Sequence, residues 1–225
     1  MARIGFNWIK DLSPATREAL MARARDRKLP NASVLYRQGD TTQELFQIVS
    51  GEIRMFVLDE DGQEALIYIY GRGDVVADSS AIDRDPFAVT IATRGETRLK
   101  VWSVDDLAEL RAAFPEIDAS LALQMSQRVR GLLVLIQELV TLSVPARVAS
   151  RIASLAQLQG KSDSSAALSL SQADLSLMVG TTRQSINQVL SDLKGKGLID
   201  THYGQIHIKD LAGLSRYAAT AKKKA

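Results

Sequence analysis

The stretch that decides the fold runs from Val179 to Gln188 and reads Val-Gly-Thr-Thr-Arg-Gln-Ser-Ile-Asn-Gln. Gly180 suits the left-handed residue that ends a helix, and Thr181-Thr182 supplies a hydroxyl that can cap the next one. Just before it, Ser171-Gln-Ala-Asp174 has the form of a capping box at the start of a short helix. The stretch therefore predicts two short helices joined by a tight turn.

The second of these helices has two unlike faces. Its apolar residues recur at helical spacing, at Ile186, Val189, Leu190 and Leu193. The opposite face carries Arg183, Gln184, Asn187, Gln188 and Ser191. Arg, Gln and Asn can pair with base edges in the major groove, and a face without carboxylates is not repelled by phosphates. We interpret this face as a DNA-reading surface; the alternative, an ordinary solvated helix face, is usually rich in Glu and Lys.

A small β-hairpin follows this helix. Gly195 and Gly197 end the helix, and two short apolar runs, Leu198-Ile-Asp200 and Gln205-Ile-His-Ile208, flank a turn at His202-Tyr-Gly204. Together with the two helices, this hairpin predicts a winged helix-turn-helix, which we place in residues 144–225.

The N-terminal half has a different pattern. A short surface helix is expected over residues 13–29, and from Val34 to Trp102 short apolar runs alternate with Gly and Asp turn signals. This spacing predicts a β-roll of the jelly-roll type over residues 1–114. The expected strands are Leu45–Val49, Ile53–Val57, Ala65–Ile69, Val89–Ala92 and Leu99–Trp102.

A long helix is expected between the two parts, in residues 115–143. One apolar seam with coiled-coil spacing consists of Met125, Val129, Leu132, Ile136 and Leu139, and a second runs through Leu121, Met125, Leu132, Leu135, Leu139 and Leu142. Two seams allow packing on the roll and on a partner helix; the alternative is one amphipathic core helix.

Ser143-Val-Pro145 should end this helix. A further helix carrying Val148, Ile152 and Leu155 should follow, then a polar loop at 159–165 without evident chemistry. The fold class is thus α+β.

Composition narrows the functional classes. Residues 143–225 carry 11 Lys and Arg against 5 Asp and no Glu, which leaves 17 basic and 21 acidic residues in the first 142. A basic C-terminal third suits an approach to phosphates. The chain has no cysteine, so it offers no ligands for a cysteine-bound iron–sulfur cluster. Its sequence lacks a membrane-length apolar run and a signal-peptide pattern, so we expect a cytoplasmic protein. It also lacks a nucleophile–base pair, a metal-ligand cluster and a Walker phosphate loop, which argues against an enzyme.

In this order, the elements resemble the CRP/FNR family of bacterial regulators over nearly the whole chain. The roll is similar to a cyclic-nucleotide-binding domain at Gly39-Asp40, Glu44–Gly51, Asp61-Gly62 and Gly73-Asp-Val-Val76, and the segment from Pro115 to Leu139 resembles the family's dimer helix. The most specific match is the decisive stretch itself. The resemblance implies a dimeric transcription factor that binds duplex DNA and RNA polymerase.

The resemblance also assigns roles to residues of the DNA-binding part. Arg183, Gln184, Asn187 and Gln188 match base-contacting positions, although many members have Glu at the second and Arg at the last. Positions that contact phosphates are matched by Thr181, Thr182 and Ser185, with Ser191 and the wing-tip His202 as further candidates. A solvated turn is the alternative for His202. Because of the two differences, the family's usual half-site is not expected.

The effector site departs further from the family. Nucleotide-binding members have Gly-Glu and, about ten residues later, Arg-Ser or Arg-Thr, whereas this chain has Ala77-Asp-Ser-Ser80 and then Pro86-Phe-Ala88. Phe87 stands in place of the phosphate-pairing arginine, and Leu132 and Leu133 replace polar residues that meet the adenine. Cyclic AMP is therefore an unexpected ligand. Haem is also unexpected, because both histidines fall in the wing. Candidate pocket residues are Asp78, Ser79, Ser80, Arg84, Phe87, Ala88, Leu132 and Leu133, with a surface loop as the alternative for Arg84 and a turn for residues 78–80.

These observations lead to one expectation with three alternatives. The expectation is a homodimeric regulator that recognises a near-palindromic site and is controlled by an unidentified small molecule bound at the roll and long helix. One alternative is a constitutive DNA binder with a vestigial pocket. Another is a ligand-binding module that acts on a protein partner, and the least favoured is an enzyme.

Overall fold

The structure, a computed structural model, describes residues 6–41, 43–58, 62, 64–158, 167–202 and 204–220. By internal contacts the chain divides into two compact units, Gly5–Arg128 and Val129–Ala225, the latter with Met1–Ile4. The division falls within one long helix, α4 (Glu116–Thr141).

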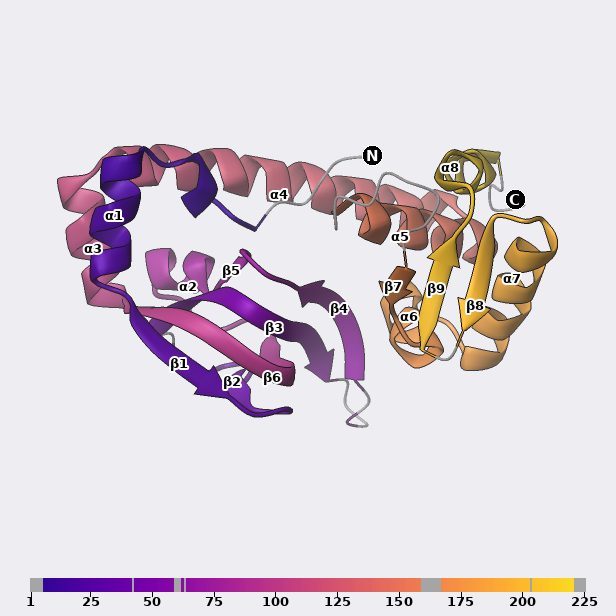
Figure 1. Ribbon diagram of the computed structural model, residues 1–225, viewed down its shortest axis with the longest axis horizontal. Helices are drawn as coiled ribbons and strands as arrows, with labels where there is room; N and C mark the ends of the chain where they lie inside the picture. The colour runs from indigo at the N-terminus through magenta and orange to yellow at the C-terminus, as the bar shows by residue number, and fades with distance from the viewer. Residues whose placement is uncertain are drawn as a thin grey trace. The chain divides into compact units, whose positions relative to one another are not determined.

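The first unit is built on one antiparallel sheet of six strands (Figure 1). β1, β6, β3 and β4 are neighbours in that order, while β2 pairs with β6 and β5 pairs with β3. The strands are β1 (Arg25–Leu29), β2 (Val34–Tyr36), β3 (Glu44–Leu58), β4 (Glu64–Tyr70), β5 (Val75–Val76) and β6 (Thr90–Ser103). This confirms the expected β-sheet sensor fold.

Two predicted breaks between strands are wrong. The runs 45–49 and 53–57 belong to the single strand β3, and the runs 89–92 and 99–102 fall almost entirely in β6. The pairing of β3 with β6 shifts register on both sides of Ser50, as a β-bulge does. Gly51 lies at this irregularity with a φ of 87°, a conformation that favours glycine. A side chain would not fit there, because a Cβ would lie 2.5 Å from the Glu96 carbonyl oxygen. The apparent turn is thus a bend within one long strand.

Short helices surround this sheet: η1 (Ile9–Asp11), α1 (Pro14–Ala22), α2 (Asp78–Asp83) and α3 (Val104–Ala113). The helix predicted over 13–29 is too long, because residues 25–29 pair with β6 as β1. The core centres on two fully buried tryptophans, and the indole N–H of Trp102 donates to the Leu20 carbonyl oxygen at 2.7 Å.

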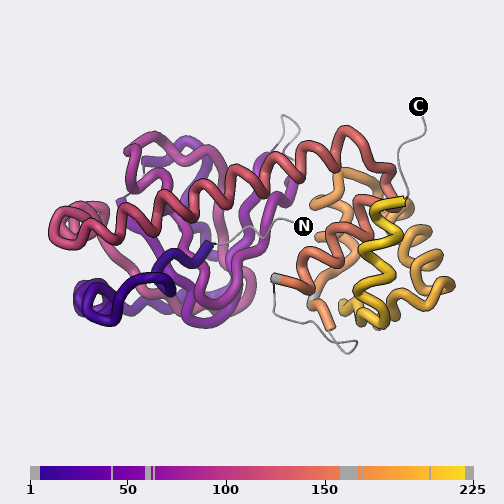
Figure 2. Tube along the Cα trace, turned by 90° about the horizontal axis from the view of Figure 1, so that it is seen from above, coloured from indigo at the N-terminus to yellow at the C-terminus, as the bar shows by residue number. Residues whose placement is uncertain are grey.

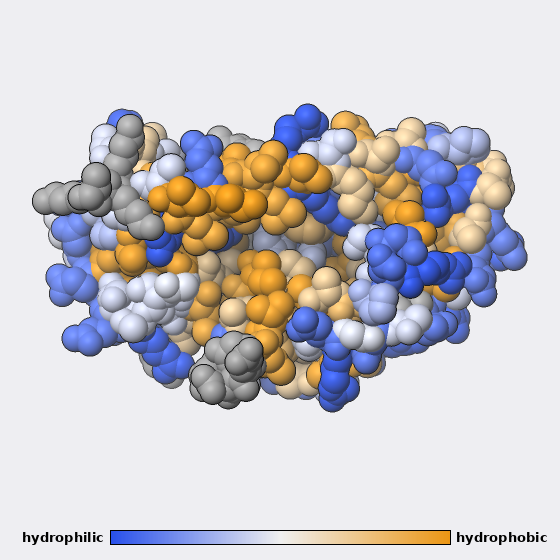
Figure 3. All heavy atoms as spheres, turned by 180° about the vertical axis from the view of Figure 1, so that it is seen from behind, coloured by the Kyte–Doolittle hydropathy of each residue, from blue (hydrophilic) through white to orange (hydrophobic). Residues whose placement is uncertain are grey.

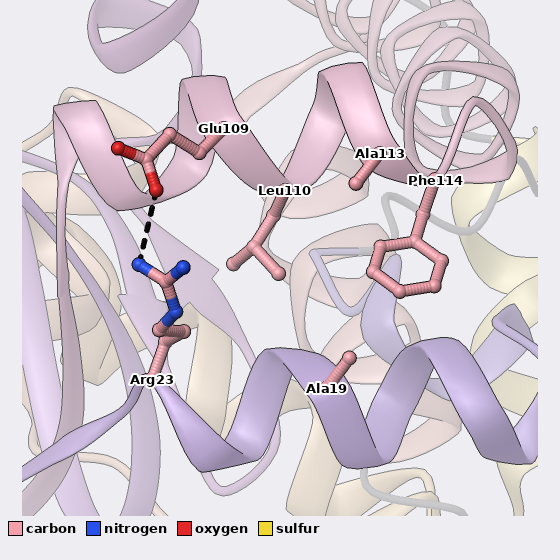
Figure 4. A pocket seen from close by; sticks show the side chains of 6 residues that line it. All are labelled: Ala19, Arg23, Glu109, Leu110, Ala113 and Phe114. Carbon is pink, nitrogen blue, oxygen red and sulfur yellow. Dashed lines mark hydrogen bonds and ion pairs between the residues drawn. The ribbon is translucent and has the colours of Figure 1, made fainter.

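A hollow of about 310 Å³ lies between α1 and α3. Figure 4 shows Leu110 and Ala113 on α3, and Phe114 directly after it, facing Ala19 on α1, with the ion pair between Arg23 and Glu109 at one end. No predicted site residue lines it.

The second unit contains the end of α4 and seven further elements. These are α5 (Val144–Leu158), β7 (Ala167–Ser169), α6 (Gln172–Val179), α7 (Arg183–Gly195), β8 (Ile199–His202), β9 (Gln205–Ile208) and α8 (Leu211–Thr220). Figures 1 and 2 show α8 beside α5. The predicted helix-turn-helix and hairpin are present; β7 and α8 were not predicted, and the 159–165 loop lies outside the described residues.

Candidate nucleic-acid interface

The turn between α6 and α7 has the predicted local structure. Ser171 begins α6 by accepting a hydrogen bond from the Asp174 backbone N–H at 3.0 Å. Gly180 ends it in the left-handed region, with a φ of 67°. Thr182 then caps α7, since its hydroxyl oxygen accepts from the Ser185 backbone N–H at 3.2 Å. Each cap satisfies a backbone group that a helix end otherwise leaves unpaired, so the two helices meet in one defined geometry.

Helix α7 buries one face and exposes the other. Its buried face is formed by Ile186, Val189, Leu190 and Leu193. The five residues of the predicted DNA-reading face are all exposed: Arg183, Gln184, Asn187, Gln188 and Ser191. Thr182 is exposed, and Thr181 and Ser185 are half-buried, at the N-terminal end of the same helix. The positive end of the helix dipole and these hydroxyls suit a phosphate there.

One carboxylate of α7, Asp192, lies close to this surface. The Tyr217 hydroxyl donates to Asp192 at 3.0 Å, and the Lys196 ammonium lies 3.4 Å from it. Burial, followed by this hydrogen bond to Asp192, raises the pKa of the Tyr217 hydroxyl. The negative charge of Asp192 is thus engaged within the protein, which limits its repulsion of phosphates.

The wing is a three-stranded sheet in the order β7-β9-β8. His202 lies exposed at the end of β8, and its ring meets that of His207 edge-on, with 4.8 Å between centroids. Asp200 on β8 binds Lys194 at 2.8 Å and Lys209 at 3.4 Å. The Lys194 ammonium, the Thr201 backbone N–H and Lys209 hold the pKa of Asp200 well below its usual range. Sequence reasoning did not single out His207 or the two lysines.

Arg147 on α5 joins two helix ends in this unit. Its Nη1 donates to the Leu142 carbonyl oxygen at 3.2 Å, and its Nη2 donates to that of Val179, the last residue of α6, at 3.4 Å. A cation is favoured where helix carbonyls point, because the dipole is negative there. Nearby, the Ser150 hydroxyl donates to Glu138 of α4 at 2.6 Å. These contacts tie α6, and through it α7, to the end of α4.

Helix α4 exposes an apolar seam. Val129, Leu132, Ile136 and Leu139 are each more than half exposed, and Met125 is half-buried. Figure 3 shows hydrophobic side chains gathered along this helix. Exposed apolar residues at coiled-coil spacing are typical of a helix that pairs with another.

The buried face of α4 in the first unit contains a charged residue that the sequence analysis missed. Arg128 donates through Nη1 and Nη2 to the two carboxylate oxygens of Asp78, at 2.8 Å and 2.7 Å. Its guanidinium also lies 4.6 Å from the ring centroid of Phe6. Arg128 continues the buried row Ile117, Leu121 and Gln124 at steps of four, three and four. An arginine in such a row signals a buried partner, and this was the available clue.

Asp74, near this pair, has an unusually high pKa for an aspartate. Burial raises its pKa to about 6, although the Gly71 backbone N–H and the Arg128 charge partly oppose the shift. Its Oδ2 accepts from the Gly71 N–H at 2.9 Å. The sensor thus contains a carboxyl group whose pKa lies well above that of an ordinary aspartate.

The structure brings few of the predicted pocket residues together. Phe87 is buried, and its ring stacks on Tyr36 with 4.8 Å between centroids. Arg84 binds Asp105 at 3.4 Å and is half exposed. Ser79 and Ala88 are exposed, Ser80 is half-buried, and Leu132 and Leu133 belong to the other compact unit. Asp78 is the only one of the eight candidate pocket residues, all of them described, that is buried and paired with a charged residue.

Among the described residues, no helix is long and apolar enough to cross a membrane, and no cluster of three or more His, Cys, Asp or Glu has the geometry to hold a metal ion.

Taken with the exposed face of α7, the β-sheet sensor and the capped helix-turn-helix define the protein as a DNA-binding transcriptional regulator.

Comparisons with known proteins assign it to a family. Residues 146–217 match the Crp-like helix-turn-helix domain, and residues 26–114 match the cyclic nucleotide-binding domain. A CRP-like cAMP-activated global transcriptional regulator of Mycobacterium tuberculosis is 27% identical over 97% of this chain and 98% of its own. The Cyclic AMP receptor protein of Thermus thermophilus is 23% identical over 92% of this chain and 94% of its own. The chain belongs to the CRP/FNR family of transcriptional regulators.

Solved structures share the fold. A CooA mutant from Carboxydothermus hydrogenoformans matches with a TM-score of 0.76 at 20% identity, covering 95% of each chain. The c-di-GMP responsive global regulator CLP of Xanthomonas campestris matches with a TM-score of 0.73 at 22% identity, covering 87% of this chain and 99% of its own. At these identities the likeness concerns the fold.

Proposed function

We propose that this regulator acts as a homodimer on a near-palindromic DNA site, with half-sites about 34 Å apart. The exposed face of α7 is the observation that carries the proposal. Arg183, Gln184, Asn187 and Gln188 read bases, while Thr181, Thr182, Ser185, Ser191 and His202 contact phosphates. In this scheme residues 1–114 form the sensor, 115–143 the dimerisation helix and 144–225 the DNA-binding part. The protein works in the cytoplasm with RNA polymerase as a partner.

The exposed seam of α4 supports the dimer. Val129, Leu132, Ile136 and Leu139 leave a continuous apolar strip in solvent in a single chain. Packing of this strip against α4 of a second subunit removes apolar surface from water, and the seams of two identical helices can bury each other. A two-fold pair of recognition helices then requires a two-fold DNA site.

Cyclic AMP does not suit the sensor, and its effector is a different small molecule. Phe87 stands where nucleotide-binding members carry an arginine for the phosphate. Its backbone is held by hydrogen bonds to Gly39 and Asp40, at 2.7 Å and 2.8 Å, and its ring packs on Tyr36. A phenyl ring offers no donor to a phosphate. Arg128, the buried cation of this region, is already neutralised by Asp78. An anionic ligand would therefore have to displace a carboxylate.

Two other readings deserve a test. A constitutive DNA binder with a vestigial pocket is favoured by the closed pair of Asp78 and Arg128 and by the packed Phe87. Calorimetry with cyclic AMP separates it from a nucleotide-controlled regulator, because a clear binding heat would contradict both the vestigial pocket and our argument from Phe87. A module that acts only on a protein partner is less favoured, because it has no use for the exposed Arg-Gln-Asn-Gln face.

The DNA-binding proposal is tested by a mobility-shift assay on a site selected from random duplexes. Arg183→Ala should weaken binding to the selected site by about 1–3 kcal/mol, the discrimination of one bidentate base contact. Arg37→Ala, which removes the same charge from an exposed position in the first unit, should leave binding unchanged. Equal behaviour of the two variants would overturn the assignment of α7.

A further inference from the structure

The chain contains two histidines, and both lie in one ring-to-ring contact on the wing. We propose that they act as a unit: His202 contacts a DNA backbone phosphate in its protonated form, and His207 holds the His202 ring in place. DNA binding then takes up a proton at each wing. This inference rests on the proposed DNA-binding function and extends it to His207, which has no assigned role.

Strand register places both rings on the same side of the wing. His202 lies opposite Gln205, and Asp200 lies opposite His207, so the two histidines are diagonal neighbours on one face of the β8–β9 pair. Ile206, on the alternate face, is buried in the unit. The rings meet nearly at right angles, at 88°, which limits the orientations open to His202. His207 is half-buried and His202 exposed, as expected of a support and a contacting group.

The charged groups around the pair leave a phosphate as its natural partner. Asp200 is the carboxylate opposite His207, and its charge is balanced by Lys194 from α7 and Lys209 at the end of β9. On the other side of β9, Ala167 of β7 lies opposite His207 and is uncharged. Among the described residues of the three wing strands, Asp200 is the only carboxylate. A protonated imidazole here therefore gains most from an external anion.

The proposal places a single positive charge on the two rings, and their geometry suits this. Two positive charges on rings 4.8 Å apart repel each other, whereas a single imidazolium can direct its edge at the face of the neutral ring. Histidine is the side chain whose charge ordinarily changes between pH 5 and 8. A phosphate brought to His202 favours the charged form, and by linkage the charged form favours the phosphate. DNA affinity should therefore fall as pH rises through this range.

The experiment measures binding of the full-length protein to a fluorescein-labelled 30-base-pair duplex of mixed sequence. Phosphate contacts are independent of sequence, so this probe reports them without knowledge of the target site. Dissociation constants are measured at pH 6, 7 and 8 at one ionic strength. For the natural protein we expect affinity to fall about fivefold for each wing between pH 6 and 8. The series is repeated with Asp74→Asn, to remove a buried carboxyl group whose pKa is raised to about 6.

Three variants separate the roles of the two rings. His202→Gln should abolish the pH dependence and bind at pH 6 about as weakly as the natural protein does at pH 8. His207→Ala should reduce the pH dependence, and His207→Phe, which keeps the edge-on ring contact, should restore it. A His202→Gln protein that keeps the natural pH dependence would overturn the inference alone. Equal behaviour of His207→Ala and the natural protein would overturn the positioning role, and a natural protein that binds no duplex at any pH would overturn the proposed function as well.

Discussion

Arg128 binds Asp78 with both terminal nitrogens, at 2.8 Å and 2.7 Å, and both side chains are nearly removed from solvent. Removing one partner of a buried pair leaves an uncompensated charge in a poorly solvating environment. Asp78→Ala should therefore lower the free energy of unfolding by about 3 kcal/mol. Urea denaturation followed by circular dichroism measures the change.

Two further variants test the cause of that loss. Asp78→Ala combined with Arg128→Met should recover most of the stability, because the double variant buries no lone charge. Glu109→Ala breaks the solvent-exposed pair with Arg23 and should cost less than about 1 kcal/mol. If the double variant is as unstable as the sum of its single changes, the charge pair is not the source of the effect.

Asp74 should make stability depend on pH. Its pKa is raised by burial from an ordinary 3.8 to about 6, so the folded protein holds a proton that the unfolded chain has lost between these values. Stability therefore falls as pH rises from about 4 to 6 and levels off above. Asp74→Asn keeps an acceptor for the Gly71 N–H but carries no charge. It should be more stable than the natural protein by about 3 kcal/mol at pH 7 and about equally stable at pH 4. The prediction is contradicted if the difference in urea midpoint between Asp74→Asn and the natural protein is the same at pH 4 and pH 7.

The parts of the fold that could be predicted are those governed by neighbouring residues. The α6–α7 turn depends on Ser171, Gly180 and Thr182, each of which acts within a few positions of itself. The exposed and buried faces of α7 follow from helical periodicity alone, so the candidate DNA-reading residues could be named with the fold.

Features that depend on distant partners could not be read in this way. Residues 25–29 have a helix-like composition but become strand β1 because β6 offers them an edge. Strand β3 continues past Gly51 because β6 pairs with both of its halves. Arg128 and Asp78 are 50 positions apart, so the helical row of Arg128 could indicate a buried partner but not which residue it is. The contact of His202 with His207 likewise needs the strand register.

The seam of α4 provides a direct test of dimerisation. Ile136→Asp places a charge in the centre of the apolar strip, where a partner helix would have to desolvate it. We expect a monomer by analytical ultracentrifugation at a concentration where the natural protein is a dimer. Gln137→Asp adds the same charge at the neighbouring exposed position outside the seam and should leave the dimer intact. A dimeric Ile136→Asp protein would place the subunit contact elsewhere.

Base preference should follow the residue at position 184. Gln184 is exposed on α7, and an amide that both donates and accepts pairs with adenine, whereas a carboxylate accepts from the cytosine amino group. Gln184→Glu should therefore shift one position of each half-site from adenine toward cytosine. The expected discrimination is about 1–3 kcal/mol, or roughly fivefold to 150-fold in relative affinity. Selection from random duplexes, with the natural protein and the variant in parallel, measures this shift.

Ser191→Ala, which removes a candidate phosphate contact, should weaken binding to all sequences alike, since phosphates carry no sequence information. If Gln184→Glu selects the same half-site as the natural protein, this side chain does not contact a base.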